Sequence, residues 1–134
     1  MKPVDQTRFY NKDAGTHGNC QQAATASIFD LPLDAVPNFM DFQGEGLPGF
    51  WQKFWEFVRS LGYEPYERHT HNGAVPYFEG YYLAYGPSSR GVSHAVVYRA
   101  GKLAHDPHPS REGIKEVETI CLFVPLDPAR MRLT

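Results

Sequence analysis

Long apolar runs, clusters of one charge sign and a cysteine framework are all missing from this chain of 134 residues. No uninterrupted apolar stretch approaches the roughly 20 residues that a membrane span needs. Residues 1–6 contain no apolar region of the kind found in secretory signals. We therefore expect a protein of the cytoplasm that has no membrane partner.

The balance of charge excludes a second class of partner. Thirteen Lys+Arg residues stand against fifteen Asp+Glu, and the basic residues form no run. A nucleic-acid-binding surface needs a basic patch, so we expect no nucleic-acid partner. The two cysteines, in a chain without an export signal, indicate free thiols rather than disulfides. At 42% hydrophobic residues the chain can bury one core, and we expect a single domain over residues 1–134.

Helical patterns occupy the first half of the chain and strand patterns the second. One helix is expected to begin at Cys20 and to stop near Leu31, because Pro32 disfavours a helical residue before it. An amphipathic helix is expected over about 48–61, ended by Gly62. Strand patterns cover residues 63–68, 77–85, 92–99, 102–106 and 117–124. The layout predicts an α+β fold, with N-terminal helices packed on a C-terminal antiparallel sheet.

The first of these helices begins with Cys20, a residue suited to covalent chemistry. Gly18 and Asn19 are turn and N-cap residues, so Cys20 lies where free backbone N–H groups and the helix dipole favour an anion such as a thiolate. Counting on from Cys20, a stripe of small and apolar side chains at helical spacing faces a core; it consists of Ala23, Ala24, Ser27 and Ile28. The alternative is that Cys20 is only a small buried residue, as free cysteines often are. Cys121 alternates with apolar residues on a strand and is interpreted as core.

A hairpin over residues 92–106 decides whether a base reaches this thiol. A two-residue turn at Ala100-Gly101 needs positive φ at Ala100, which a side chain disfavours. A three-residue loop that includes Arg99 fits better, with glycine in the left-handed position. In that register His94 lies directly across from Asp106 on one face, whereas the two-residue turn would put Asp106 on the opposite face.

Together these residues form a catalytic hypothesis. Cys20 is the nucleophile, His94 is the base that takes and returns the proton, and Asp106 orients the imidazole and stabilises its charged form.

The order Cys, His, Asp, with Ser93-His94-Ala95-Val96-Val97-Tyr98 followed by His105-Asp106-Pro107, resembles the papain-like cysteine peptidase superfamily. Within it the sequence is most similar to the double-glycine leader peptidase type, and it also resembles small proteins of bacteria and their phages. The resemblance implies a papain-like fold and a thiol hydrolase without a cofactor. Its substrate would be a peptide, a protein or a small amide, cleaved at an amide, isopeptide or thioester bond through an acyl-enzyme.

Such enzymes use a glutamine a few residues before the cysteine to help build the oxyanion hole. Here the upstream glutamine is Gln6, which stands further back. Either the loop over residues 11–18 returns Gln6 to the site, or the backbone N–H of Cys20 and the side chain of Asn19 take this role. The chain also lacks the Cys-Gly-x-Cys-Trp pattern of the cathepsin branch, which argues against a deep two-lobed cleft.

Other functions use the same residues. The triad would equally serve an acyltransferase of the transglutaminase type or a deamidase, which differ in the nucleophile that reaches the intermediate. A binding module without turnover is another reading. A metal site built from Cys20, His94 and a further histidine is disfavoured, because the sequence has no Cys-x-x-Cys or His-x-x-x-His pair.

Glycine-rich loops are expected to form the walls of the site. One holds Gly44, Gly46 and Gly49, and the other, over residues 86–91, precedes His94. Loops that order on binding would then contribute to specificity. Trp51 follows the first loop and either packs in the core or lines the cleft.

Overall fold

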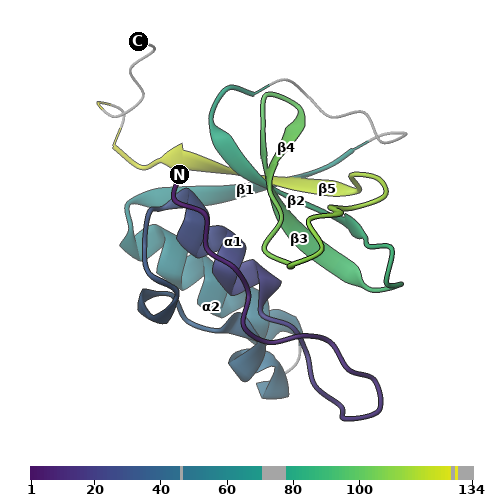
Figure 1. Ribbon diagram of the computed structural model, residues 1–134. Coiled ribbons are helices and arrows are strands. Elements are labelled where there is room, and N and C mark those ends of the chain that lie inside the picture. Colours follow the sequence, from purple (N-terminus) through teal and green to yellow (C-terminus); the bar gives the residue numbers. More distant parts are fainter. Residues whose placement is uncertain (46, 71–77, 128, 130–134) are drawn as a thin grey trace.

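Figure 1 shows the computed structural model of the chain, which describes residues 1–45, 47–70, 78–127 and 129. The helices come first: α1 (Cys20–Ile28), the short 3-10 helices η1 (Leu33–Ala35) and η2 (Phe39–Glu45), and α2 (Leu47–Ser60). The strands follow: β1 (Tyr63–His69), β2 (Tyr81–Pro87), β3 (Ser93–Arg99), β4 (Lys102–His105) and β5 (Thr119–Pro125). The predicted α+β fold, with helices before an antiparallel sheet, is confirmed.

Most element boundaries differ from the expected ones by a few residues. The strand expected over 77–85 begins at Tyr81 and runs on to Pro87, and residue 77 lies outside the described residues, as does Gly46. The first helix ends at Ile28 rather than near Leu31. Asp30 adopts a positive φ of 56°, and the N–H of Leu31 returns to the carbonyl of Ala26 at 3.0 Å. This left-handed cap ends the helix before Pro32 has any influence.

The five strands form one antiparallel sheet in the order β1-β5-β2-β3-β4. The last strand therefore lies between the first two, and β1 is an edge strand, a position that tolerates Pro65. Both α-helices lie on the same side of the sheet (Figure 1), with α1 against β2 and β3 and α2 against β1. The beginning of α1 thus comes close to the beginning of β3.

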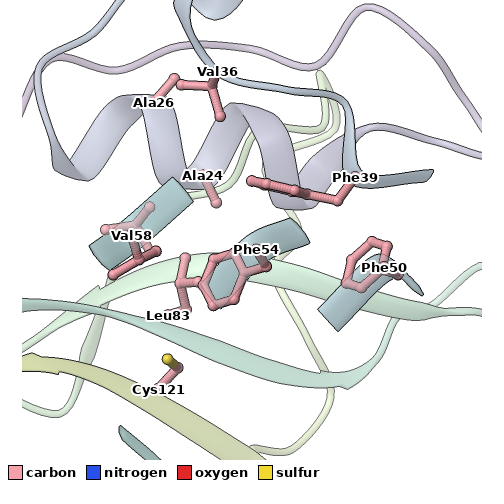
Figure 2. Close-up of a cluster of buried hydrophobic side chains, with 10 residues drawn as sticks. Ala24, Ala26, Val36, Phe39, Phe50, Phe54, Val58, Leu83 and Cys121 are labelled. Carbon is pink, nitrogen blue, oxygen red and sulfur yellow. The ribbon is translucent and has the colours of Figure 1, made fainter. Parts of the chain in front are cut away.

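The core joins these layers. In Figure 2, Ala24 of α1, Phe54 of α2 and Leu83 of β2 belong to one cluster of buried side chains. Helix α1 is buried on nearly all sides: residues 21–27 are all buried, and Ile28, expected in the core stripe, is only half-buried. The N-terminal segment covers its outer side (Figure 1), where Ser27 Oγ accepts a hydrogen bond from the N–H of Val4 at 2.9 Å. Cys121 is fully buried in the same cluster, as predicted.

The turn of the β3–β4 hairpin differs from the prediction. The chain adopts the two-residue turn, with φ of 52° at Ala100 and 76° at Gly101, and Arg99 pairs with Lys102. The expected three-residue loop is therefore wrong. A positive φ at alanine costs about 1–2 kcal/mol. Tertiary hydrogen bonds offset this cost, because the N–H of Ala100 donates to the carbonyl of Phe78 at 2.8 Å.

A β-bulge then corrects the register further along the same hairpin. Tyr98 pairs with Leu103, but Val97 pairs with His105, so Ala104 is an extra residue in β4. The bulge reverses the facing of every residue beyond it. Asp106 consequently returns to the face that carries His94, where it lies diagonally to His94 instead of directly opposite.

Gly86 is the residue of β2 that pairs with His94. A Cβ atom added at Gly86 would lie 1.9 Å from the carbonyl oxygen of Glu116. That backbone is held against β2 on both sides, since the N–H of Lys115 donates to Pro87 and the N–H of Glu118 to Tyr85, each at 2.8 Å.

We therefore expect Gly86→Ala to lower the free energy of unfolding by about 3 kcal/mol, through displacement of backbone that cannot yield locally. Urea unfolding followed by tryptophan fluorescence measures the loss. Gly91→Ala is the matched control, because Gly91 has open space around it and a φ of 83°, which limits its cost to about 1 kcal/mol. Equal stability of the two variants would contradict the prediction.

Candidate active site

Cys20 is the first residue of α1 and is partly exposed. Asn19 precedes it with φ of −113° and ψ of 38°, and within the described chain its side chain makes no capping hydrogen bond to the helix. The helix start is therefore an uncapped N-terminus, where the first N–H groups and the dipole favour a negative charge. The thiol of Cys20 lies at that end.

His94 and Asp106 form a short, buried pair. His94 Nε2 donates to Asp106 Oδ1 at 2.6 Å, and the two residues are only 4% and 2% exposed. Asp106 also accepts backbone N–H groups, from His108 at 2.9 Å and from Gly113 at 2.7 Å. Burial alone would raise the pKa of Asp106, but these hydrogen bonds outweigh it and lower the pKa to about 2. Asp106 is therefore a carboxylate throughout the physiological range.

His94 connects this carboxylate to the thiol. Burial would lower the pKa of His94, but the hydrogen bond with Asp106, a hydrogen bond with Cys20 and the charges of both residues raise it to about 9. Since Asp106 occupies Nε2, Nδ1 is the ring nitrogen left for Cys20. The structure thus brings together the three residues predicted as nucleophile, base and orienter, with His94 in the imidazolium form at neutral pH.

The shifted pKa values of His94 and Asp106 predict a pH range over which the free energy of unfolding is highest. The folded pKa of His94, about 9, lies above its ordinary value of 6.5, so its contribution is complete below pH 6.5 and is lost as the pH rises through 9. The folded pKa of Asp106, about 2, lies below its ordinary 3.8, so its contribution is complete above pH 4 and is lost as the pH falls through 2.

We expect maximal stability between about pH 4 and 6.5, with a loss of about 2 to 3 kcal/mol on either side. Urea unfolding from pH 2.5 to 9.5 measures it. In His94→Gln the decline above pH 6.5 should flatten; an unchanged decline would assign it to other groups.

Gln6 reaches the same cleft as Cys20. The chain doubles back through a loop closed by the bridge between Asn11 and Thr16, and the N–H of Asn19 donates to the carbonyl of Arg8 at 3.3 Å. Gln6 is buried and its Nε2 donates to the same Arg8 carbonyl at 2.9 Å. One N–H of this amide is not used by Arg8. Gln6 Oε1 has no hydrogen-bond partner within the described part of the chain. The loop therefore places Gln6 in the same cleft as Cys20, which is the first of the two arrangements considered from the sequence.

Asn19 does not offer its side chain to the site. Its Oδ1 accepts the N–H groups of Thr7 and Arg8, both at 2.9 Å. Its Nδ2 donates to Thr7 Oγ1 and to Gln22 Oε1, both at 3.1 Å. Both donors and both acceptor positions of the amide are thus occupied. This side chain therefore has no unused N–H for an oxyanion in this structure, and it anchors the returning segment that carries Gln6.

Sequence reasoning missed the residues that hold the N-terminal segment against the segment after β4, beside the site. Arg111 forms a bidentate pair with Asp5, at 2.6 and 2.7 Å, and also donates to the backbone carbonyl of Asp106 at 2.5 Å. The N–H of Gln6 donates to the carbonyl of Pro107 at 3.1 Å. These bonds fix Gln6 and Asp106 relative to each other. No local pattern could have indicated them, because Asp5 and Arg111 are 106 positions apart.

Two cavities flank the Cys20–His94 pair. The first, which we call the Arg90 cleft, measures about 280 Å³, and its own walls include Phe9, Tyr10, His17, Arg90, Val92 and His108. The second, the Trp51 cleft, measures about 250 Å³, and its own walls include Gln21, Gln43, Phe50, Trp51, Tyr85 and Ala95. Both clefts share Cys20, Met40 and His94. Cys20 therefore lines two cavities whose other walls differ in chemistry.

Metal ligands are not grouped in the part of the chain that the structure describes, where no three His, Cys, Asp or Glu side chains are placed to hold an ion. Within the same residues, every helix is too short or too polar to cross a membrane. Cys121 lies away from both clefts, and burial raises the pKa of its thiol.

Comparison of the chain with protein-family models, with curated proteins and with solved structures gives no match. The site has therefore to be interpreted from its own geometry.

Proposed function

We propose that this protein is a papain-like thiol hydrolase that cleaves an amide, isopeptide or thioester bond through an acyl-enzyme on Cys20. The observation that carries the proposal is the 2.6 Å bond between His94 and Asp106, with the other ring nitrogen turned to a cysteine at an open helix N-terminus. A thiol, a buried imidazole and a buried carboxylate in that order form the nucleophile, base and orienter of covalent catalysis.

Each residue has a defined step. The thiolate of Cys20 attacks the substrate carbonyl carbon, and the imidazolium of His94 gives its proton to the leaving amine or thiol as the C–N or C–S bond breaks. A water molecule then attacks the acyl-enzyme, His94 takes one of its protons, and the carboxylic acid leaves as the sulfur is released as thiolate. Asp106 keeps the ring oriented and balances its charge in both steps.

The oxyanion of each tetrahedral intermediate needs donors that are already in place. The backbone N–H of Cys20, at the open start of α1, is one candidate donor. The second N–H of the Gln6 amide is the other, because Gln6 lines the Arg90 cleft together with Cys20. The bonds of Gln6 and Asn19 to the chain around Arg8 hold this donor in position before substrate arrives.

A general acyl donor tests the proposal without knowledge of the natural substrate. We expect the protein to hydrolyse N-acetyl-phenylalanine thiobenzyl ester, with release of the thiol measured by absorbance. Acid quenching followed by mass spectrometry should find the acyl group on Cys20. Cys20→Ala should lower the enzyme-dependent rate at least 10³-fold, whereas Cys121→Ala, a change away from both clefts, should retain it. Full hydrolysis by Cys20→Ala would reject the proposal. The absence of any acyl-enzyme would favour a binding module on this fold.

A further inference from the structure

The Arg90 cleft differs from the Trp51 cleft in charge. Among the described residues that line the Arg90 cleft there is no aspartate or glutamate, and Arg90 is a permanent cation at its wall. Among the described side chains that line the Trp51 cleft there is no arginine, lysine, aspartate or glutamate, and its walls include Phe50, Trp51 and Tyr85 together with Gln21 and Gln43. A substrate that lies across Cys20 therefore meets a cationic side and an apolar side.

Arg90 projects from a turn whose backbone is held in place. The N–H of Ser88 donates to the carbonyl of Val92 at 2.9 Å, and the N–H of Arg90 donates to Ser88 Oγ at 3.3 Å. Ser88 is only 1% exposed. The base of the Arg90 side chain is therefore fixed, directly before the strand that carries His94.

The side chain of Arg90 is exposed, and few of its N–H donors are occupied within the described part of the chain. Its NH1 donates to Ser110 Oγ at 3.3 Å, and no carboxylate in the described chain lies within ion-pair distance of it. A guanidinium has five N–H donors in a planar fork that matches a carboxylate. Most of that capacity is available to a ligand in the cleft.

His108 adds a second, uncharged donor to the same wall. The N–H of Ser110 donates to His108 Nδ1 at 3.0 Å, so Nδ1 is the acceptor and the proton of the neutral ring is on Nε2. Burial and the charge of Arg90 lower the pKa of His108, which keeps the ring neutral. His108 packs edge-to-face against His94, with ring centroids 6.2 Å apart. The wall of the cleft that carries Arg90 and His108 therefore reaches His94.

We infer that the Arg90 cleft is a carboxylate-recognition subsite, and that the substrate carries a carboxylate close to the bond that Cys20 cleaves. This inference rests on the proposed function, because it concerns the substrate of the same thiol. The carboxylate has two possible sources, the free C-terminus of a peptide and the side chain of an aspartate or glutamate. Both present the planar pair of oxygens that Arg90 can bind.

Bromoacetyl probes with one reactive group and different tails test the subsite. Bromoacetyl-glycine and bromoacetyl-glycinamide compare a terminal carboxylate with its neutral amide. Bromoacetyl-glutamate α-amide and bromoacetyl-glutamine α-amide make the same comparison for a side chain. The rate of Cys20 alkylation is followed by mass spectrometry at pH 7 for the parent, Arg90→Gln and Arg90→Lys. Iodoacetamide, which has no tail, measures the reactivity of the thiol alone.

In the parent we expect the carboxylate probe of at least one pair to react about tenfold faster than its neutral partner, the effect of one charge-assisted contact. With each probe rate divided by the iodoacetamide rate of the same variant, Arg90→Gln should bring that ratio to about one, and Arg90→Lys should retain part of the preference. The pair that responds identifies the source of the carboxylate. Equal ratios in the parent and Arg90→Gln would overturn the inference. Slow iodoacetamide reaction that is independent of His94 would instead reject the proposed function, so the two failures are distinguishable.

Discussion

Replacement of His94 by alanine is expected to slow the alkylation of Cys20 by iodoacetamide about 100-fold at pH 6.5. The proposed mechanism requires a thiolate of Cys20 beside the imidazolium of His94, whose charge Asp106 balances. An ordinary thiol has a pKa of about 8.5 and is only about 1% ionised two units lower, and the thiolate is the reacting form. Stopped reactions between pH 4 and 10, analysed by mass spectrometry, give the rate profile.

Two features of the chain make this measurement specific. Cys121 is fully buried, and burial raises the pKa of its thiol, so it should not compete for the reagent. His69→Ala is the matched control, because His69 is an exposed histidine on β1 that bonds to Thr119 Oγ1 at 3.1 Å, away from the thiol. Its rate should stay within about twofold of the parent at every pH. A parent rate that rises only near pH 8.5, with or without His94, would mean that Cys20 and His94 have a structural role.

Replacement of Asp106 by alanine is expected to lower the free energy of unfolding by about 3 to 5 kcal/mol. The carboxylate is buried, and its removal leaves His94 as a buried charge without its partner. It also leaves the N–H of Gly113 without the acceptor that it meets at 2.7 Å. Urea unfolding at pH 6, within the expected plateau of stability, measures the loss.

Two variants separate the buried charge pair from an ordinary surface pair. Asp106→Asn keeps an acceptor oxygen and the shape of the side chain, so its loss should be smaller than that of Asp106→Ala. Asp5→Ala removes an exposed carboxylate that pairs with Arg111, and should cost at most about 1 kcal/mol. If Asp106→Ala were as mild as Asp5→Ala, the His94–Asp106 pair would be only a marginal contribution to the fold.

The hairpin shows how His94 and Asp106 meet as predicted although the predicted turn is wrong. The steric objection to positive φ at Ala100 is sound for an isolated hairpin, but the carbonyl of Phe78 and the hydroxyl of Tyr82 bind the turn from outside it. A bulge at Ala104 then restores the facing of Asp106 that the turn had reversed. The unexpected turn and the bulge therefore cancel in their effect on the face that carries Asp106. Neither has a signal in the residues between 92 and 106, because both depend on packing against the rest of the sheet.

Gln6 and Asn19 show a different case, in which the sequence offers two amides for one role and cannot choose between them. Both are amides near the cysteine in sequence, and either can donate to an oxyanion. The returning strand decides between them: it consumes every hydrogen-bonding position of Asn19 and leaves an N–H of Gln6 beside the Arg90 cleft. The choice between the two amides therefore depends on how the loop folds back, which involves contacts between distant residues.

The order of helices before strands, the helix that begins at Cys20 and the antiparallel hairpin after residue 92 could be predicted from the sequence alone. These features follow from short-range causes, namely helical and strand periodicity and turn residues. The bulge that turns Asp106 to the face of His94, the return of Gln6, the Asp5–Arg111 pair and the two clefts are visible only in the folded chain. Each of these depends on contacts between residues far apart in the chain, whose energies no local pattern contains.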